Sequence, residues 1–217
     1  MNSNIKRIGS PLVVVGVAVF VALFACHEYL LNAAPDYLVA RIILKAAMSA
    51  ILAGVAWAQF AACKTALSRG IAIGLTICAA ADVGMSINLT VGALLFMAGH
   101  ATFIVAFIKE CRPSRRAIAI WIVVAAALAV VCIFAPAGPR VTSVLRIAGC
   151  VYMFFVVGML VMSHGVGGRI FIGGATFFAS DALIVVQLIV GQTTLIHIVS
   201  LGVYYIACLI MATGSKR

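Results

Sequence analysis

Two aspartates are unusual because each lies near the middle of a long apolar run. They are Asp82 and Asp181, whereas the other acidic residues, Glu28, Asp36 and Glu110, lie near the ends of such runs. At ~1.5 Å per helical residue, both aspartates are roughly 17 Å from the end of their run. A carboxylate at that depth costs about 2.5 kcal/mol or more unless it faces the protein interior and finds a partner. We therefore expect a functional role for both, rather than only a bond to a neighbouring helix.

A pair of carboxyls in a site of low dielectric can act as an acid and a base. Both cannot ionise cheaply, so one stays protonated near neutrality, and Lys45 can hold the other ionised. Such a pair suits hydrolysis through an oxocarbenium-like state, as in glycosidic bonds. A vinyl ether breaks in the same way, because the acid protonates the alkene carbon and the base delivers water. Burial in a membrane indicates a lipid-like substrate.

Several other polar residues lie in apolar runs and are candidates to bind substrate or support the carboxyls. They are Lys45, His100, Ser180, Arg146, Tyr152, Tyr204 and Tyr205. Each has a simpler interpretation: Lys45 can extend to the membrane surface, a lone His is commonly a satisfied core group, and a buried Tyr commonly makes one hydrogen bond. Arg146 lies one turn into its run and is placed to meet a phosphate or headgroup.

The composition shows which elements must position these residues. Of the 217 residues, 65% are hydrophobic and 9% are charged, and the mean hydropathy is +1.25. Soluble domains carry about 25% charged residues, so a soluble protein, a disordered chain and a nucleic-acid binder are excluded. Apolar runs of about 20 residues predict an all-α polytopic membrane protein.

We predict eight transmembrane helices in a single membrane domain over residues 1–217. The predicted spans are Pro11–Leu31, Leu38–Ala61, Ile71–Ile87, Val91–Ile108, Ala117–Phe134, Val141–Ser163, Ile170–Val190 and Thr194–Ala212. The third and seventh spans share a pattern, because Ile73–Gly74 precedes Asp82 at the spacing at which Ile172–Gly173 precedes Asp181. This pattern indicates two duplicated four-helix halves, although chance similarity between apolar helices explains it equally well.

Basic residues predict the orientation of these spans. One side of the predicted membrane domain receives eleven of them: Lys6, Arg7, Lys64, Arg69, Lys109, Arg112, Arg115, Arg116, Arg169, Lys216 and Arg217. The other side receives only Arg140. Because basic residues accumulate on the cytoplasmic side, we expect both termini to be cytoplasmic. The expected location is a cell membrane, such as a bacterial inner membrane.

The motifs around the two aspartates resemble those of the YhhN-like lysoplasmalogenases. The first runs from Ala80–Ala81–Asp82 to Phe96–x–x–Gly99–His100–x–x–Phe103–x–x–x–Phe107. The second is Gly174–Ala175–x–Phe177–x–x–Ser180–Asp181, and the third is Tyr204–Tyr205–x–Ala207–x–Leu209. Lys45 resembles the lysine of the family's second helix, and the resemblance covers about Arg41 to Ile210.

This resemblance implies an eight-span hydrolase with the family's two aspartates at Asp82 and Asp181. Its substrates would be a lysoplasmalogen and water, and its products a fatty aldehyde and a glycerophospho-base. We expect no cofactor and no metal, because the histidines form no HxxxH or HExxH motif and the cysteines form no CxxC pair.

Two other functions remain open from the residues alone. A proton-coupled transporter would also place carboxyls, a lysine and a histidine at mid-depth. An intramembrane aspartyl protease also uses two aspartates on neighbouring helices, but that class carries a GxGD motif. Here the residues before the aspartates are Ala80–Ala81 and Ser180, so the protease ranks third.

Overall fold

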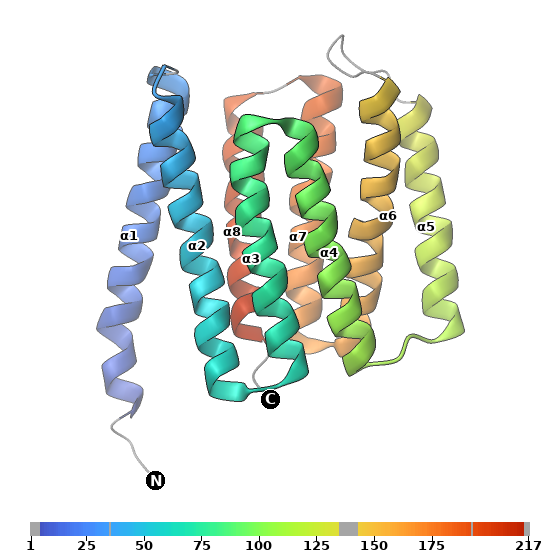
Figure 1. Ribbon diagram of the computed structural model, residues 1–217, viewed down its shortest axis with the longest axis horizontal. Helices are drawn as coiled ribbons and strands as arrows, with labels where there is room; N and C mark the ends of the chain where they lie inside the picture. The colour runs from blue at the N-terminus through green and yellow to red at the C-terminus, as the bar shows by residue number, and fades with distance from the viewer. Residues whose placement is uncertain (1–4, 35, 135–142, 192, 215–217) are drawn as a thin grey trace. The chain divides into compact units, whose positions relative to one another are not determined.

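The computed structural model describes residues 5–34, 36–134, 143–191 and 193–214, in which every regular element is an α-helix. The helices, in chain order (Figure 1), are α1 (Ile5–Ala33), α2 (Leu38–Cys63), α3 (Ala66–Ile87), α4 (Leu89–Glu110), α5 (Arg115–Phe134), α6 (Ser143–Val166), α7 (Gly168–Val190) and α8 (Thr194–Gly214). The prediction of an all-α fold with eight helices is confirmed. The largest differences from the predicted bounds are at two starts, because α1 begins at Ile5 rather than Pro11 and α3 at Ala66 rather than Ile71.

Seven of these helices, α2 to α8, are long and apolar enough to cross a bilayer over the residues described. The first helix contributes a shorter apolar stretch, Ala18–Ala33. Part of the predicted sixth span, at Val141, lies outside the described residues, as do Arg140, Lys216 and Arg217.

The chain divides into two compact units, residues 1–48 and residues 49–217. In the first unit, a short turn joins α1 to α2, and the backbone N–H of Tyr37 donates to the carbonyl of Ala34. Near the end of α1, His27 and Glu28 are both buried and form an ion pair at 3.0 Å. The prediction of a single membrane domain over the whole chain stays a prediction.

Five helices of the second unit pack as a ring, in which each helix contacts two others. The neighbours are α3 with α4, α4 with α6, α6 with α7, α7 with α8, and α8 with α3. Figure 1 shows α3 and α4 as adjacent antiparallel helices. This five-helix ring encloses the buried polar side chains described below, so its packing decides where they meet.

A single residue, Asn88, makes the connection between α3 and α4. Its backbone N–H donates to the carbonyl of Gly84 at 2.7 Å, and its side-chain oxygen accepts from the N–H groups of Thr90 and Val91. Both helix ends are thus satisfied by one residue. A connection this short holds α3 and α4 antiparallel over their whole length, as the predicted tight hairpin at Asn88–Thr90 requires.

Small residues let α3 and α4 approach closely. A Cβ added to Gly99 would lie 2.7 Å from the Sγ of Cys78, which is too close for any side chain. A Cβ on Gly74 would overlap the ring of Phe103. Gly99 precedes His100, so this contact fixes the depth at which the imidazole faces the ring interior.

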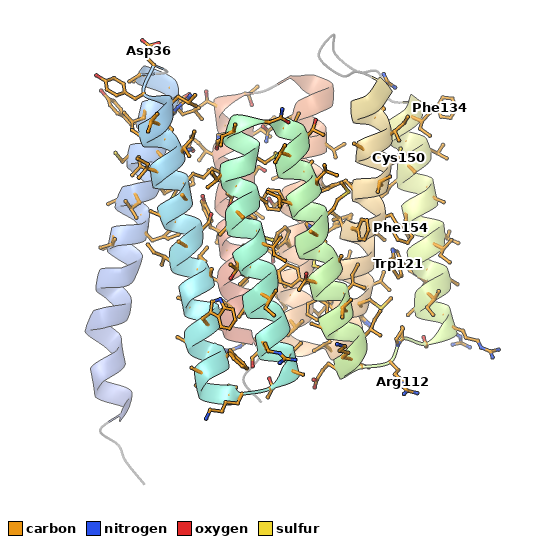
Figure 2. The ribbon with its side chains drawn as sticks, in the orientation of Figure 1. Asp36, Arg112, Trp121, Phe134, Cys150 and Phe154 are labelled. Carbon is orange, nitrogen blue, oxygen red and sulfur yellow. The ribbon has the colours of Figure 1, made fainter. Side chains whose placement is uncertain are left out.

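The fifth helix lies outside the ring and packs against α6. Figure 2 shows Trp121 of α5 beside Phe154 of α6. Their ring centroids are 4.6 Å apart, and the Trp121 indole donates to the Phe154 carbonyl at 2.7 Å. Most other α5 side chains that the structure describes are exposed and apolar, as expected for a helix that faces lipid.

Candidate active site

Each helix of the five-helix ring contributes one polar side chain to its interior. These side chains are Asp82 of α3, His100 of α4, Tyr152 of α6, Asp181 of α7 and Tyr204 of α8. Asp82 is 1% exposed, His100 0% and Asp181 3%. Charged and polar groups buried this completely in an apolar bundle are costly unless they find polar partners, so the contacts among them decide their role.

Two hydroxyl groups hold Asp82. Ser49 of α2 donates to its Oδ2 at 2.5 Å, and Tyr204 of α8 donates to the same oxygen at 2.8 Å. An oxygen that accepts two hydroxyl hydrogen bonds uses both of its lone pairs as an acceptor. These two bonds join α2 and α8 to α3 at the Asp82 carboxyl.

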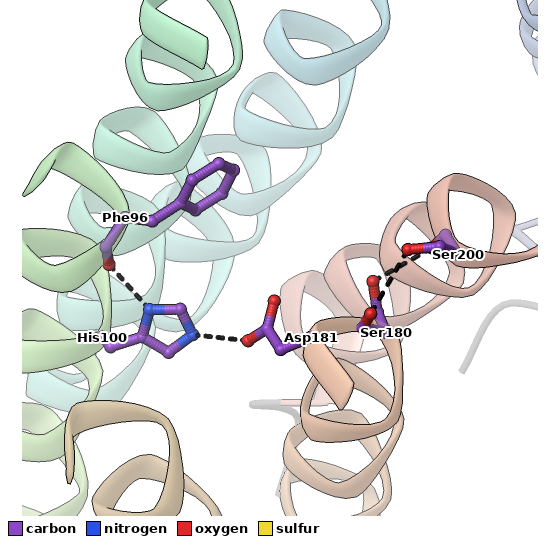
Figure 3. A network of polar contacts seen from close by, with 5 residues as sticks. All are labelled: Phe96, His100, Ser180, Asp181 and Ser200. Carbon is purple, nitrogen blue, oxygen red and sulfur yellow. Dashed lines mark hydrogen bonds and ion pairs between the residues drawn. The ribbon is translucent and has the colours of Figure 1, made fainter. Parts of the chain in front are cut away.

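Asp181 has a different partner, the imidazole of His100 (Figure 3). The Oδ2 of Asp181 lies 3.4 Å from the Nε2 of His100. The other ring nitrogen, Nδ1, is 2.7 Å from the carbonyl oxygen of Phe96, four residues earlier on α4. Within the described residues, neither Nε2 nor Oδ2 has a partner at hydrogen-bond geometry, so the contact is close but loosely aligned.

These contacts determine how many protons the pair carries. A carbonyl oxygen only accepts hydrogen bonds, so Nδ1 of His100 must carry its hydrogen. If Nε2 carried no hydrogen and Asp181 were ionised, a nitrogen lone pair would face a carboxylate oxygen inside the apolar bundle. The contact is favourable only when one further proton lies on Nε2 or on Oδ2. A single proton between Nε2 and Oδ2 would satisfy both atoms, so this pair is the candidate in the cluster to hold a transferable proton.

Two thiols lie close enough to interact with both carboxyls. The Cys78 thiol interacts electrostatically with Asp82 and Asp181, and so does the Cys208 thiol. The Tyr152 hydroxyl interacts with the same two carboxyls and is a hydrogen-bond partner of Asp181. Shared neighbours on α3, α6 and α8 place the two aspartates in one polar cluster.

Aromatic rings surround this cluster and exclude water from it. Phe177 meets His100 edge-on at 4.9 Å between centroids and Tyr204 at 5.3 Å. The Phe96 ring also packs against the Tyr204 ring, with centroids 5.8 Å apart. The Tyr152 ring packs against the His100 ring, with centroids 5.5 Å apart. Edge-to-face contacts of this kind hold rings in fixed orientations, so the imidazole and the Tyr204 phenol are positioned before any substrate binds.

The structure places the remaining sequence candidates elsewhere. Ser180 donates to the carbonyl of Ser200 at 3.0 Å, and Ser200 returns a bond to the carbonyl of Ser180 at 3.2 Å (Figure 3). This reciprocal pair joins α7 to α8 beside Asp181. Tyr205 is buried, with its ring 5.1 Å from that of Tyr204.

Arg146 contacts α5 rather than the cluster. Arg146 of α6 donates to the carbonyl of Ile133, one residue before the end of α5. It therefore satisfies a helix-end carbonyl. Lys45 belongs to the first unit, and the role that the sequence suggests for it stays a prediction.

Sequence analysis did not single out Ser49, Cys78 or Cys208 as site residues. A periodic signal for them exists, because residues four apart share one face of a helix. Ser49 follows Lys45 by four, Cys78 precedes Asp82 by four, and Cys208 follows Tyr204 by four. Scattered cysteines and serines are common in membrane helices, however, so the spacing becomes informative only when the facing helix is known.

Among the residues that the structure describes, no three His, Cys, Asp or Glu side chains are grouped to hold a metal ion. The buried groups instead bond one another and adjacent backbone. The helices and this cluster define a polytopic α-helical membrane protein with a cluster of buried polar side chains inside the bundle.

Comparison with known proteins identifies the family. The YhhN family model matches residues 40–215, so the chain belongs to the YhhN family. The matched range contains all of the polar cluster, from Ser49 to Cys208. A search of the curated proteins and a search of the solved structures each returned no match.

Proposed function

We propose that this protein hydrolyses the vinyl ether bond of lysoplasmalogens to a fatty aldehyde and a glycerophospho-base. Membership of the YhhN family and the motifs around Asp82 and Asp181 support the reaction class. The observation that carries the proposal is the unequal setting of the two buried carboxyls. One accepts two hydroxyl hydrogen bonds, and the other lies 3.4 Å from an imidazole nitrogen.

The shared proton makes Asp181 and His100 the acid. Protonation of the alkene carbon is the difficult step in cleaving a vinyl ether, and it needs a proton held close to an apolar carbon. The loose 3.4 Å contact leaves that proton available for transfer rather than fixed in a strong hydrogen bond. In this role Asp181 is the catalytic residue, and His100 positions and replenishes its proton.

Asp82 is the base in this mechanism. Its carboxylate, held by Ser49 and Tyr204, accepts a proton from the attacking water. A base must be ionised when the acid is protonated, and the two hydroxyl donors favour that state. Tyr204 also fixes the direction in which the second carboxylate oxygen points.

The proposed steps balance as follows. The acid gives its proton to the carbon β to the ether oxygen, and the double-bond electrons leave an oxocarbenium ion at the α carbon. Water adds to that carbon as Asp82 takes one of its protons, which forms a hemiacetal. The hemiacetal hydroxyl then gives its proton to Asp181 as the aldehyde carbonyl forms, while Asp82 gives the proton it took from water to the glycerol oxygen, which leaves as the alcohol. The acid regains its proton in the second half, so the site ends as it began.

The direct test is to incubate the purified protein with a lysoplasmenyl lipid and measure free aldehyde. A lysolipid with a saturated alkyl ether at the same position is the matched control. It has no alkene carbon to protonate, so it should release nothing. No aldehyde from the vinyl ether, or equal cleavage of both lipids, would contradict the proposal.

A solvent label tests the carbon protonation itself. In deuterium oxide the fatty aldehyde, trapped immediately by reduction, should carry one deuterium at the carbon next to the carbonyl. The rate should also fall about two- to fourfold if proton transfer to carbon limits turnover. An unlabelled aldehyde would mean that water attacks by another route, even if the substrate is correct.

Proton-coupled transport is the second candidate, because the proton shared by His100 and Asp181 would also suit it. Sealed vesicles containing the protein distinguish the two. Uptake of a solute that follows an imposed pH gradient, with no aldehyde released from lysoplasmenyl lipid, would favour transport.

We also propose that both termini are cytoplasmic, because basic residues are unequally distributed between the two sets of loops. A reporter enzyme that is active only outside the cytoplasm, fused after Arg217, should be silent, and one fused between Asn32 and Asp36 should be active. The reverse pattern would invert the orientation without affecting the chemistry.

A further inference from the structure

A groove with a volume of about 320 Å³ lies between α3 and α4, away from the buried carboxyls. Its lining combines small residues with a cation from each helix: Arg69 in the first turn of α3 and Lys109 in the last turn of α4. Arg69 lies roughly 20 Å along α3 from Asp82, at ~1.5 Å per residue. The groove is therefore a separate feature from the proposed active site.

The shape of the groove follows from two small residues. A Cβ on Gly70 would overlap that of Ala106, so the helix axes come close together at this level. Larger side chains on either side, Ile73 at 39% exposed and Val105 at 51%, form apolar walls. The result is a furrow with an apolar floor and walls that runs toward a positively charged end.

Within the described part of the chain, the two cations at that end have no counter-ion. Among the described residues, the structure gives neither Arg69 nor Lys109 a side-chain hydrogen bond or an ion pair. The acid nearest in sequence, Glu110, has an interaction of its own. The other polar group of the lining, the Thr102 hydroxyl, donates to the carbonyl of Ala98 at 2.8 Å. The positive charge therefore faces outward, where an external anion can meet it.

We propose that this groove binds an anionic phospholipid of the bilayer. An acyl chain lies in the furrow between Ile73 and Val105, and the phosphate lies between Arg69 and Lys109. Both helices are apolar enough to span the membrane, so the furrow opens to lipid chains, and its charged end is at the level of the headgroups. Basic residues near a leaflet that contains anionic lipid attract its headgroups.

Such a lipid would contact both α3 and α4 at the helix ends farthest from Asn88, and would hold those ends together. The hairpin positions both Asp82 and His100, so an occupied groove would stabilise the arrangement of the site without touching it. The proposal does not depend on the chemistry of that site, and its test measures binding rather than turnover.

The test uses full-length protein purified in a mild detergent. Native mass spectrometry counts bound lipid as dioleoyl phosphatidylglycerol is titrated in, with dioleoyl phosphatidylcholine as the zwitterionic comparison. We expect phosphatidylglycerol to bind at least about tenfold more tightly, and 0.5 M salt to reduce the difference. The R69Q/K109Q protein should lose the preference, whereas the matched R115Q/R116Q protein, which removes two cations at the start of α5, should keep it.

A second variant tests the furrow independently of its charges. Ala101 lies on the groove lining, and A101F fills the furrow while leaving both cations in place. It should weaken phosphatidylglycerol binding about tenfold, and helical circular dichroism verifies that it folds. Equal binding of the two lipids by the wild type, or loss of the preference in R115Q/R116Q alone, would overturn the proposal. A preference retained in both R69Q/K109Q and A101F would place the lipid elsewhere.

Discussion

The two halves of the polar cluster hold the same residue type in different ways. Asp82 meets two hydroxyls, Ser49 and Tyr204, at ordinary hydrogen-bond distances. Asp181 meets the imidazole of His100 at 3.4 Å, and that imidazole is itself fixed by a backbone carbonyl. Hydroxyls can donate without changing charge near neutral pH, whereas an imidazole exchanges a proton readily.

The comparison shows that depth and residue type do not determine the role of a buried acid. Asp82 and Asp181 lie at the same position in a similar sequence pattern, and both are nearly inaccessible. Their partners differ, and in the proposed mechanism that difference decides which carboxyl is the acid and which is the base. An acid–base pair can therefore be built from two identical side chains, provided that the facing helices supply different groups.

Removing either carboxyl should have the largest effect. Asp82→Asn and Asp181→Asn keep the shape of the side chain but cannot transfer a proton, so aldehyde release should fall at least about a hundredfold in each. Asp36→Asn is the control, because Asp36 is exposed and lies outside the five-helix ring. Turnover near the wild-type level in either buried variant would remove that residue from the chemistry.

Replacing the imidazole should cost less and should depend on Asp181. His100→Gln keeps a polar group at this position but cannot hold the shared proton, so we expect a loss of about thirtyfold in kcat. If the two residues act as one proton-holding unit, H100Q/D181N should be no slower than Asp181→Asn alone. H100Q/D82N should be slower than Asp82→Asn. Simple additivity in both double variants would contradict the shared proton.

Removing one hydroxyl donor from Asp82 should have a moderate effect. Ser49→Ala and Tyr204→Phe each delete one of two hydrogen bonds to a charged group, which is worth about 1.5 kcal/mol or more, or roughly tenfold in rate. Because these hydroxyls hold the carboxylate and not the substrate, kcat should fall while KM stays within about twofold of the wild type. A variant whose KM rises while kcat is unchanged would indicate that the hydroxyl contacts the substrate instead.

The sequence patterns are sufficient to predict the helices and to single out the two aspartates. Continuous apolar runs interrupted by residues such as Asn88 define the helices, and a carboxyl in such a run is expensive enough to be noticed. The partners were harder to predict. Tyr152, Tyr204 and His100 were candidates because a polar ring in an apolar run is also unusual.

The remaining site residues depend on packing that the sequence does not encode locally. Ser49 is thirty-three positions from Asp82, and an isolated serine in an apolar helix usually bonds its own backbone. The position of Arg146, one turn into its predicted span, suggests that it binds a lipid headgroup. In the structure it donates to a carbonyl of α5 instead. Which helix lies opposite a given face follows from the order of the five-helix ring, and hydropathy alone does not determine that order.

Replacing the two serines that lie near the carboxyls should affect aldehyde release to different extents. Ser49 donates to a carboxylate, whereas Ser180 donates to the Ser200 backbone. Ser180→Ala should therefore slow aldehyde release by no more than about threefold. It should also lower the stability of the α7–α8 pair by about 0.6 kcal/mol, the average for a hydrogen bond between membrane helices. A loss equal to that of Ser49→Ala would mean that Ser180 acts on the reaction directly.

Arg146→Gln should have the smallest effect on the reaction. The Arg146 guanidinium donates to the Ile133 carbonyl near the end of α5, and α5 lies outside the five-helix ring. Glutamine can still donate one hydrogen bond but loses the positive charge that favours a helix C-terminus. We therefore expect kcat and KM for lysoplasmenyl lipid within about twofold of the wild type, together with a slightly lower melting temperature. A KM raised about tenfold at unchanged kcat would instead make Arg146 a ligand of the substrate phosphate, because only binding common to the ground state and the transition state would then be lost.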